Sequence, residues 1–127
     1  MAVTGITLDA GALIGFDRGE RRAVGLVRRA RERGETLAAP AGAVGQAWRD
    51  GRRQANLARL LASDACDVVP LDDLAARAAG QLCGVAGAGD VIDASVVLCA
   101  RSRQHRVATS DPDDLRRLDP RTEVVVI

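Results

Sequence analysis

Residues 89–115 read GDVIDASVVLCARSRQHRVATSDPDDL, which predicts a helix, a turn, a short strand and the start of a second helix. Asp90 and Asp93 open the first helix and, three residues apart, lie on the same side of its first turn. The apolar run VVLCA that follows indicates a buried helix. Asp111 lies in the turn TSDP (109–112) that follows the strand candidate at 107–108, and ligands in open α/β sheets bind at the carboxyl ends of the strands.

A second aspartate has the same placement near the start of the chain. Residues 4–8, TGITL, form a strand candidate, and Asp9 stands at its carboxyl end before a short helix. Two such strands side by side, with the acidic start of the later helix directed at them, would bring four carboxylates to one edge of a sheet. These are Asp9, Asp90, Asp93 and Asp111, and together they outline a metal site.

Each of these aspartates also has a purely structural interpretation. Asp90 and Asp93 fit the N-cap and third positions of a helix. Asp111 and Asp9 can each cap the helix that follows them. As a set they are harder to explain in this way, because neighbouring carboxylates raise one another's pKa unless a cation lies between them. Hard divalent ions prefer oxygen ligands, and in nucleases they activate water and neutralise charge on a phosphodiester.

Short apolar stretches alternate with amphipathic stretches along the whole chain. The remaining strand candidates are 36–39, 66–71 and 122–127, and helical patterns cover 12–16, 20–33, 40–62 and 72–86. Strands that alternate with helices form a parallel sheet covered on both faces. We expect one domain, residues 1–127, folded as an α/β protein: a three-layer α/β/α sandwich around a short-stranded, mainly parallel central sheet.

Some expectations are more specific. The two helices within 40–62 should form an antiparallel hairpin, with Pro40 at the first helical position and Gln46 half-buried. The helix over 72–86 should turn Leu74, Ala78, Leu82 and Val85 inward. His105, the only histidine, is assigned to a polar loop.

Composition excludes several classes of function. Phe16 and Trp48 are the only aromatic residues, which nearly excludes base stacking on an aromatic platform. One histidine and three cysteines without CxxC spacing argue against a zinc site and indicate reduced core thiols. No basic leader or long apolar segment is evident, so we expect a soluble, cytoplasmic protein that does not engage a membrane.

The net charge is +1, and all 18 basic residues are arginines. Six of them fall on one helical pattern, as Arg21, Arg22, Arg28, Arg29, Arg31 and Arg33. A solvated face paired with nearby glutamates explains this run. The alternative is a phosphate-binding flank, because the planar guanidinium group suits phosphate. Both interpretations stay open.

Other families that place an aspartate at a sheet end do not fit. Haloacid-dehalogenase phosphatases need a second Asp two residues after the first, where this chain has Gly11, and normally a Lys. Response-regulator receivers need an acidic pair before the phosphoacceptor and a Lys, and this chain has no Lys. No Ser/His/Asp or Cys/His arrangement competes, because His105 is the only histidine.

Over essentially its full length the chain resembles a PIN domain, specifically a VapC-type toxin ribonuclease of bacterial toxin–antitoxin pairs. The matching segments are LDAGALI (8–14), PAGAVGQAWRDG (40–51), GDVIDASVVLCA (89–100) and ATSDPDDL (108–115). By this resemblance Asp9, Asp93 and Asp111 correspond to the family's metal-binding acids. Gln46 stands where the family usually has a Glu, and together with the three aspartates it completes the catalytic set. Asp90 is an extra acid, hypothesised to supply the missing negative charge as a metal ligand.

The resemblance implies an endoribonuclease that depends on Mg²⁺ or Mn²⁺ and cleaves RNA with a metal-activated water. Arg49, Arg52 and Arg53 are candidates for contacts with the RNA backbone. A cognate antitoxin that masks the site and a homodimer are also implied. The alternative is a catalytically weak or inactive PIN-like binding module, motivated by Gln46. A metal-dependent phosphatase or DNA nuclease that uses the same acids also stays open.

Overall fold

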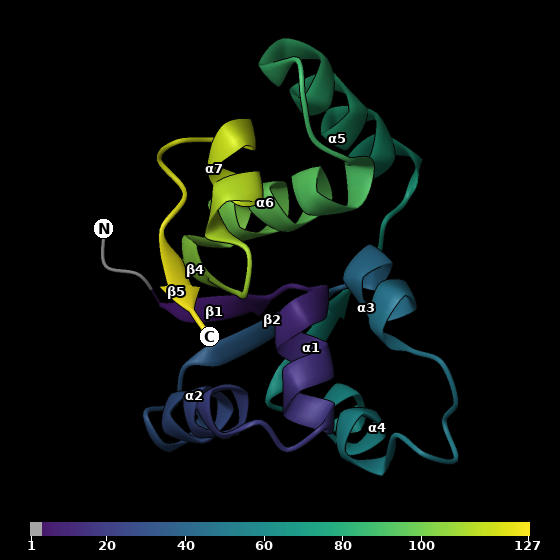
Figure 1. The fold of residues 1–127 in the computed structure, drawn as a ribbon, viewed down its shortest axis with the longest axis vertical. Coiled ribbons are helices and arrows are strands. Elements are labelled where there is room, and N and C mark those ends of the chain that lie inside the picture. Colours follow the sequence, from purple (N-terminus) through teal and green to yellow (C-terminus); the bar gives the residue numbers. More distant parts are fainter. Residues whose placement is uncertain (1–3) are drawn as a thin grey trace.

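The structure, a computed structural model that describes residues 4–127, is built around one parallel five-stranded sheet (Figure 1). The strands are β1 (Gly5–Leu8), β2 (Thr36–Pro40), β3 (Cys66–Val69), β4 (His105–Thr109) and β5 (Val124–Val126). Their spatial order is β3-β2-β1-β4-β5, so the first strand is central. All four neighbouring pairs are parallel. The expected short-stranded parallel sheet is confirmed.

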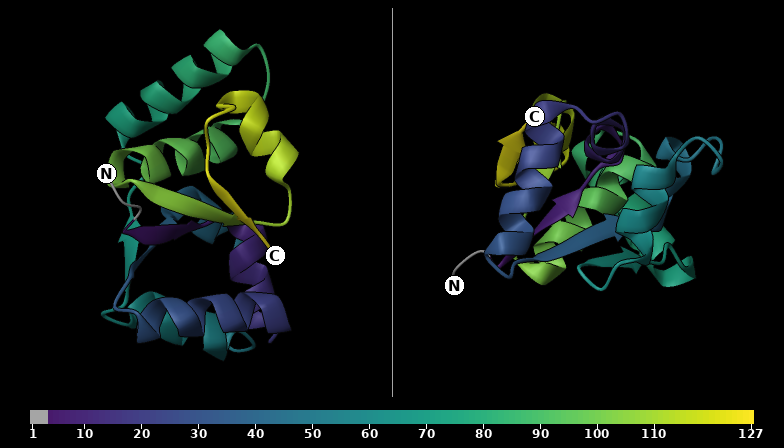
Figure 2. Two further views of the ribbon diagram at one scale, coloured as in Figure 1. Left: turned by 90° about the vertical axis from the view of Figure 1, so that its left-hand side faces the viewer. Right: turned by 90° about the horizontal axis from the view of Figure 1, so that it is seen from below.

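Helices cover both faces of this sheet (Figures 1 and 2). They are α1 (Ala10–Asp17), α2 (Arg21–Glu32), α3 (Ala41–Ala47), α4 (Ala55–Ala62), α5 (Asp73–Ala86), α6 (Val91–Arg103) and α7 (Pro112–Leu118). Helices α1, α2 and α4 lie on one side, and α6 and α7 lie on the other. Helix α5 stacks on the outside of α6. The expected three-layer α/β/α sandwich is therefore confirmed.

The core between these layers is aliphatic. Its largest fully buried side chains include Leu8, Leu37 and Val107 from the strands, and Leu13 and Leu57 from the helices. Every residue of β1 is buried, as expected for the central strand of a parallel sheet. Each such side chain contributes about 1.5–3 kcal/mol by leaving water. This packing fixes the carboxyl ends of β1 and β4, from which two of the candidate site residues project.

The expected helical hairpin within 40–62 is wrong. Helices α3 and α4 each pack against α1, and an ordered loop, 48–54, separates them. Gln54 shapes this loop: its Oε1 accepts the N–H groups of Arg49 and Asp50 at 2.7 and 2.9 Å, and its Nε2 donates to the Ala47 carbonyl at 2.9 Å. Pro40 is the last residue of β2 and occupies the N-cap position of α3. The helix begins at Ala41, so Pro40 stands one position before the first helical position expected for it.

The inward side of α5 also differs from the expectation. Leu74 and Val85 are 79% and 83% exposed, and the buried residue of this helix is Ala79. Of the other two residues expected inward, Ala78 is exposed and Leu82 is half-buried against the core, because α5 packs on α6 and not on the sheet. Between residues 4 and 127 no single helix is long and apolar enough to cross a membrane. Helices α5 and α6 pass that test only as a pair bent by 105°, on length and composition alone.

The assignment of His105 to a polar loop is wrong, because this residue begins β4 and is buried. Its Nδ1 lies 3.1 Å from the hydroxyl of Thr7 on β1, and its Nε2 lies 3.2 Å from the hydroxyl of Thr36 on β2. Gly5 leaves room for the ring, since a Cβ there would meet Nε2 at 2.5 Å. Burial lowers the pKa of His105. The histidine therefore joins three strands through hydrogen bonds that local sequence does not reveal.

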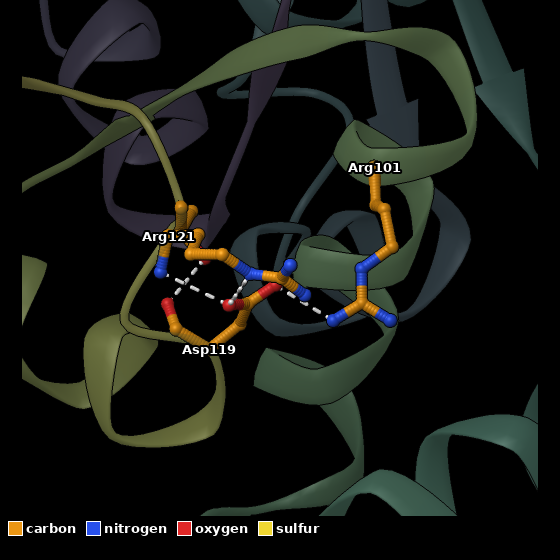
Figure 3. Close-up of polar contacts among 4 residues, drawn as sticks. Arg101, Asp119 and Arg121 are labelled. Atoms are coloured by element: carbon orange, nitrogen blue, oxygen red, sulfur yellow. Dashed lines mark hydrogen bonds and ion pairs between the residues drawn. The ribbon is translucent and has the colours of Figure 1, made fainter.

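The buried carboxylate of Asp119 links the C-terminal part of α6 to the segment that leads into β5 through hydrogen bonds (Figure 3). Arg101 donates from Nη2 to Oδ2 of Asp119 at 2.7 Å, and the backbone N–H of Arg121 donates to Oδ1 at 3.0 Å. The hydrogen bond from Arg101 lowers the pKa of Asp119, with a further contribution from the Arg121 backbone. This contact holds the connection from α7 to β5 against α6.

Candidate functional site

Three separate segments bring the four predicted aspartates to the carboxyl edge of the sheet. Asp9 follows β1, and its N–H donates to the Ala108 carbonyl of the neighbouring β4 at 3.2 Å. Asp111 follows β4 after one intervening residue. Asp90 and Asp93 begin α6, which packs against β1, β4 and α7. Parallel pairing of β1 with β4 is thus the reason that Asp9 and Asp111 reach the same edge.

The helix-capping interpretation is correct for Asp9 and Asp90 but not for Asp111. Oδ1 of Asp9 accepts the Ala12 N–H, and Oδ1 of Asp90 accepts the Asp93 N–H, both at 2.8 Å. Asp111 precedes α7, yet its side chain makes no capping hydrogen bond. Its carboxylate, like that of Asp93, therefore does not cap the start of a helix.

Thr109 connects the loops that carry Asp9 and Asp111. This residue is fully buried, and its Oγ1 accepts the Asp111 N–H at 2.9 Å. The same side chain hydrogen-bonds to the Asp9 carboxylate, which opposes the effect of burial on the pKa of Asp9. Gly11 allows the loops to approach closely, since a Cβ there would lie 2.5 Å from Oγ of Ser110.

The charges of neighbouring aspartates contribute to the raised pKa values of Asp93 and Asp9. Burial is the largest cause that raises the pKa of Asp93 to about 6, and the charges of Asp90, Asp114 and Asp9 make up smaller parts of the same shift. Burial also raises the pKa of Asp9, with a smaller contribution from the charge of Asp111. Residues from three distant segments thus share one region of excess negative charge, as the sequence pattern predicted.

Asp114 is a member of this group that the sequence analysis did not identify. A side-chain hydrogen bond shared with Asp111, together with the charge of that residue, raises the pKa of Asp114. Its spacing of three residues from Asp111 at the start of a helix is the same signal that identified Asp90 and Asp93. We refer to Asp9, Asp90, Asp93, Asp111 and Asp114 as the edge aspartates.

The chemistry of the edge aspartates suits a hard divalent cation. Such ions take carboxylate oxygens, and a cation would relieve the repulsion that raises the pKa of Asp93. In the part of the chain that the structure describes, no three His, Cys, Asp or Glu side chains are arranged to hold a metal ion as they stand. Binding would therefore require carboxylates to turn toward the ion from their present hydrogen bonds.

Gln46 does not lie half-buried as expected, because it is exposed near the end of the short helix α3. It lines a hollow of about 720 Å³ together with Ile14 and Asp17 of α1 and residues of the loop 48–54. None of the edge aspartates lines this hollow. Asp9 stands at the N-terminus of α1, whereas Ile14 and Asp17 belong to its C-terminal half.

The three arginines predicted to contact RNA belong to this same region. Arg49, in the loop after α3, turns back toward the end of that helix, and its Nη1 donates to the carbonyls of Gly45 and Trp48 at 3.1 and 2.7 Å. Arg53 is paired loosely with Asp50 at 3.8 Å, and Arg52 is exposed. Arg49 and Arg53 line the hollow beside Gln46. Their contact with RNA stays a prediction.

The chain has the α/β fold expected from its sequence, and comparison with known proteins agrees with this on the fold. No protein family model matches the sequence, and no curated protein matches it. Among solved structures, a chain of VapBC2 from Rickettsia felis bound to a DNA fragment from their promoter is similar, with 11% identity, a TM-score of 0.69 and coverage of 96% of this chain and 98% of that one.

Two further structures are similar over nearly the whole chain. FitAB bound to an IR36 DNA fragment has 16% identity and a TM-score of 0.64, covering 95% of this chain and 94% of that one. FitAcB from Neisseria gonorrhoeae has 17% identity and a TM-score of 0.61, covering 94% and 95%. At these identities the comparison establishes a shared fold.

Proposed function

We propose that this protein is a metal-dependent endoribonuclease that acts as the toxin of a toxin–antitoxin pair. The observation that carries the proposal is the convergence of Asp9, Asp93 and Asp111 from three distant segments on one edge of the sheet, where burial and neighbouring acids raise the pKa of Asp93. The fold is shared with chains of VapBC2 and FitAB, whose structures contain bound DNA fragments. This likeness supports the toxin assignment and an antitoxin as partner.

Asp9, Asp93 and Asp111 would hold Mg²⁺ or Mn²⁺, with Asp90 and Asp114 adding charge beside them. A bound divalent cation supplies charge neutralisation at the phosphodiester and makes a water molecule more acidic. The protein's own contribution is to fix the carboxylates: Thr109 orients the loop of Asp111, and the Ala12 N–H orients Asp9. Homodimer formation and a role of Arg49, Arg52 and Arg53 in RNA contact belong to the same proposal.

A second candidate is a PIN-like binding module with little or no turnover. Two observations favour it: Gln46 is neutral and exposed where the resemblance expects a Glu, and the described side chains are not arranged to chelate an ion as they stand. In this case the protein would bind its partner or RNA without cleaving it.

One experiment separates the two candidates. Purified protein, free of any antitoxin and stripped with EDTA, is incubated with RNA and with DNA in the presence of Mg²⁺, Mn²⁺ or EDTA. Cleavage of RNA that needs the ion and is lost in Asp93→Asn and Asp111→Asn supports the nuclease. Asp64→Asn, an exposed aspartate in the turn before β3, is the matched control and should cleave normally. Cleavage that persists in EDTA or in both site variants indicates a contaminant, and binding without any cleavage supports the module.

A further inference from the structure

The outward face of α2 carries four arginines arranged around one glycine. In RRAVGLVRR, residues 21–29, Arg21 and Arg22 precede Gly25 by four and three residues, and Arg28 and Arg29 follow it by three and four. Residues three and four apart are neighbours on a helix surface, so the four side chains surround Gly25. All four arginines are exposed, whereas Gly25 between them is buried, as are Ala23, Leu26, Val27 and Ala30 of this helix.

The side chain of Arg29 lies over Gly25 at the centre of this arrangement. A Cβ added to Gly25 would meet the guanidinium of Arg29, at 3.1 Å from Nη1 and 3.9 Å from Cζ. Because Gly25 has no side chain, the guanidinium of Arg29 can lie close to the helix between the other arginines. Any larger residue at position 25 would displace this guanidinium.

The charges of these four arginines are not neutralised within residues 4–127. The ion pairs of this region include none of the four, and the ion pair nearest to them along the chain joins Arg33 and Glu35 at 3.9 Å. Glu20, which precedes the helix, has its carboxylate beside Gly15 of α1: a Cβ added to Gly15 would lie 2.8 Å from Oε2 of Glu20. A solvated face paired with the nearby glutamates is therefore not what the structure contains. Like charges this close together destabilise a helix and favour an anionic ligand.

We propose that Arg21, Arg22, Arg28 and Arg29, which surround Gly25 and together form the α2 cradle, bind phosphates of the RNA strand. This inference rests on the proposed function. The edge aspartates repel a polyanion, so affinity for RNA must come from a positive surface elsewhere. Arg21 and Arg28 are seven positions apart, as are Arg22 and Arg29, which corresponds to about 10.5 Å along the helix. Helix α1, about 12 Å long, separates Asp9 from the loop that enters α2, so a strand of a few nucleotides can reach both.

The test measures binding of a labelled single-stranded RNA in EDTA, where no cleavage occurs, as a function of salt. The double variants Arg21→Gln/Arg28→Gln and Arg22→Gln/Arg29→Gln should each lower the slope of log affinity against log salt by about 1.4 and the affinity about 20-fold near 0.1 M salt. The matched control is Arg59→Gln/Arg77→Gln, which removes two exposed arginines from α4 and α5 and should leave the slope unchanged.

A second pair of variants tests the centre of the cradle without touching an arginine. Gly25→Glu places a carboxylate among the four guanidinium groups, whereas Gly25→Gln adds a neutral side chain of the same size. Both residues favour a helix more than glycine does, so both variants should fold. The Glu variant should bind RNA several-fold more weakly than the Gln variant.

Wild-type affinity and slope in all cradle variants would overturn the proposal, and so would an equal loss in the control. Loss of binding to an acidic peptide such as poly-glutamate, with RNA binding retained, would assign the surface to a protein partner and also overturn it. If RNA binds through the cradle but is not cleaved with any ion, the nuclease proposal fails while the cradle stands. If a dinucleotide is cleaved normally by variants that bind long RNA weakly, both proposals hold.

Discussion

Replacing Asp93 by Asn should make the metal-free protein more stable at neutral pH. In the folded chain the carboxyl of Asp93 has a pKa of about 6, well above its ordinary value of 3.8, because it is half-buried beside other acids. At neutral pH the group is ionised in both the folded and the unfolded chain. The folded chain therefore bears an electrostatic cost that the neutral amide removes.

The size of this effect follows from the pKa shift. A change from 3.8 to about 6 corresponds to about 3 kcal/mol at most. Because Asp93 is only half-buried, solvent screens part of this cost, and about 1–2 kcal/mol remains. For a domain of 127 residues this raises the melting temperature by about 4–8 °C. As the pH falls through 6 toward 3.8, the wild-type protein gains a proton on folding, so the advantage of the variant should disappear.

The assay is thermal and urea unfolding of both proteins in EDTA, followed by circular dichroism between about pH 4 and pH 8. Asp64→Asn is the control and should show no such pH-dependent gain, because this aspartate is exposed in a turn away from the edge aspartates. Adding Mg²⁺ should stabilise the wild-type protein more than Asp93→Asn. An Asp93→Asn variant that is less stable than the wild type, or whose difference does not change with pH, would refute the argument that the edge aspartates carry excess negative charge.

Three further predictions concern the supports of the site and the sheet. Thr109→Val should lower the free energy of unfolding by about 1–2 kcal/mol and weaken ion-dependent cleavage, because the Asp111 N–H loses its acceptor; urea unfolding and cleavage assays check this. Burial lowers the pKa of His105 and keeps the ring neutral in the folded protein, so the free energy of unfolding should fall as the pH drops below the ordinary pKa of 6.5. In His105→Gln this fall in stability with pH should be smaller than in the wild type. Asp119→Ala should cost about 1–3 kcal/mol at neutral pH and less below about pH 3.8, where the stabilisation from a lowered pKa is lost; acid titration of the melting temperature checks this.

The sequence predicts the sheet and the convergence of the acids because both follow from patterns that repeat along the chain. Aspartates directly after apolar strands must meet if the strands are parallel neighbours, and Asp9 and Asp111 illustrate this. The start of a helix marked by Asp90 is equally local, since its carboxylate accepts the Asp93 N–H. These features depend on residues only a few positions apart and on one topological rule.

The features that the sequence did not predict depend on packing partners. The period of apolar residues in α5 is correct for a helix, yet it does not reveal that the helix lies on α6 instead of the sheet, with Leu74 exposed. His105 is buried only because Thr7 and Thr36 on neighbouring strands supply hydrogen-bond partners and Gly5 supplies space. The exposure of Gln46 likewise depends on the loop shaped by Gln54.

Although the net charge is only +1, the protein has two regions of opposite charge, the edge aspartates and the α2 cradle. Neighbouring acids help to raise the pKa of Asp9, Asp93 and Asp114, and the four arginines of the α2 cradle make no ion pair with an acid in residues 4–127. If stability alone determined this surface, the two sets would be expected to mix, since pairs of opposite charge stabilise helices and like charges destabilise them. An RNA phosphodiester with a divalent cation is a ligand that satisfies both regions at once, because the cation meets the carboxylates and the flanking phosphates meet the guanidinium groups. Loss of either region alone should therefore impair cleavage in different ways: removal of the acids slows the reaction of bound RNA, and removal of the arginines weakens its binding.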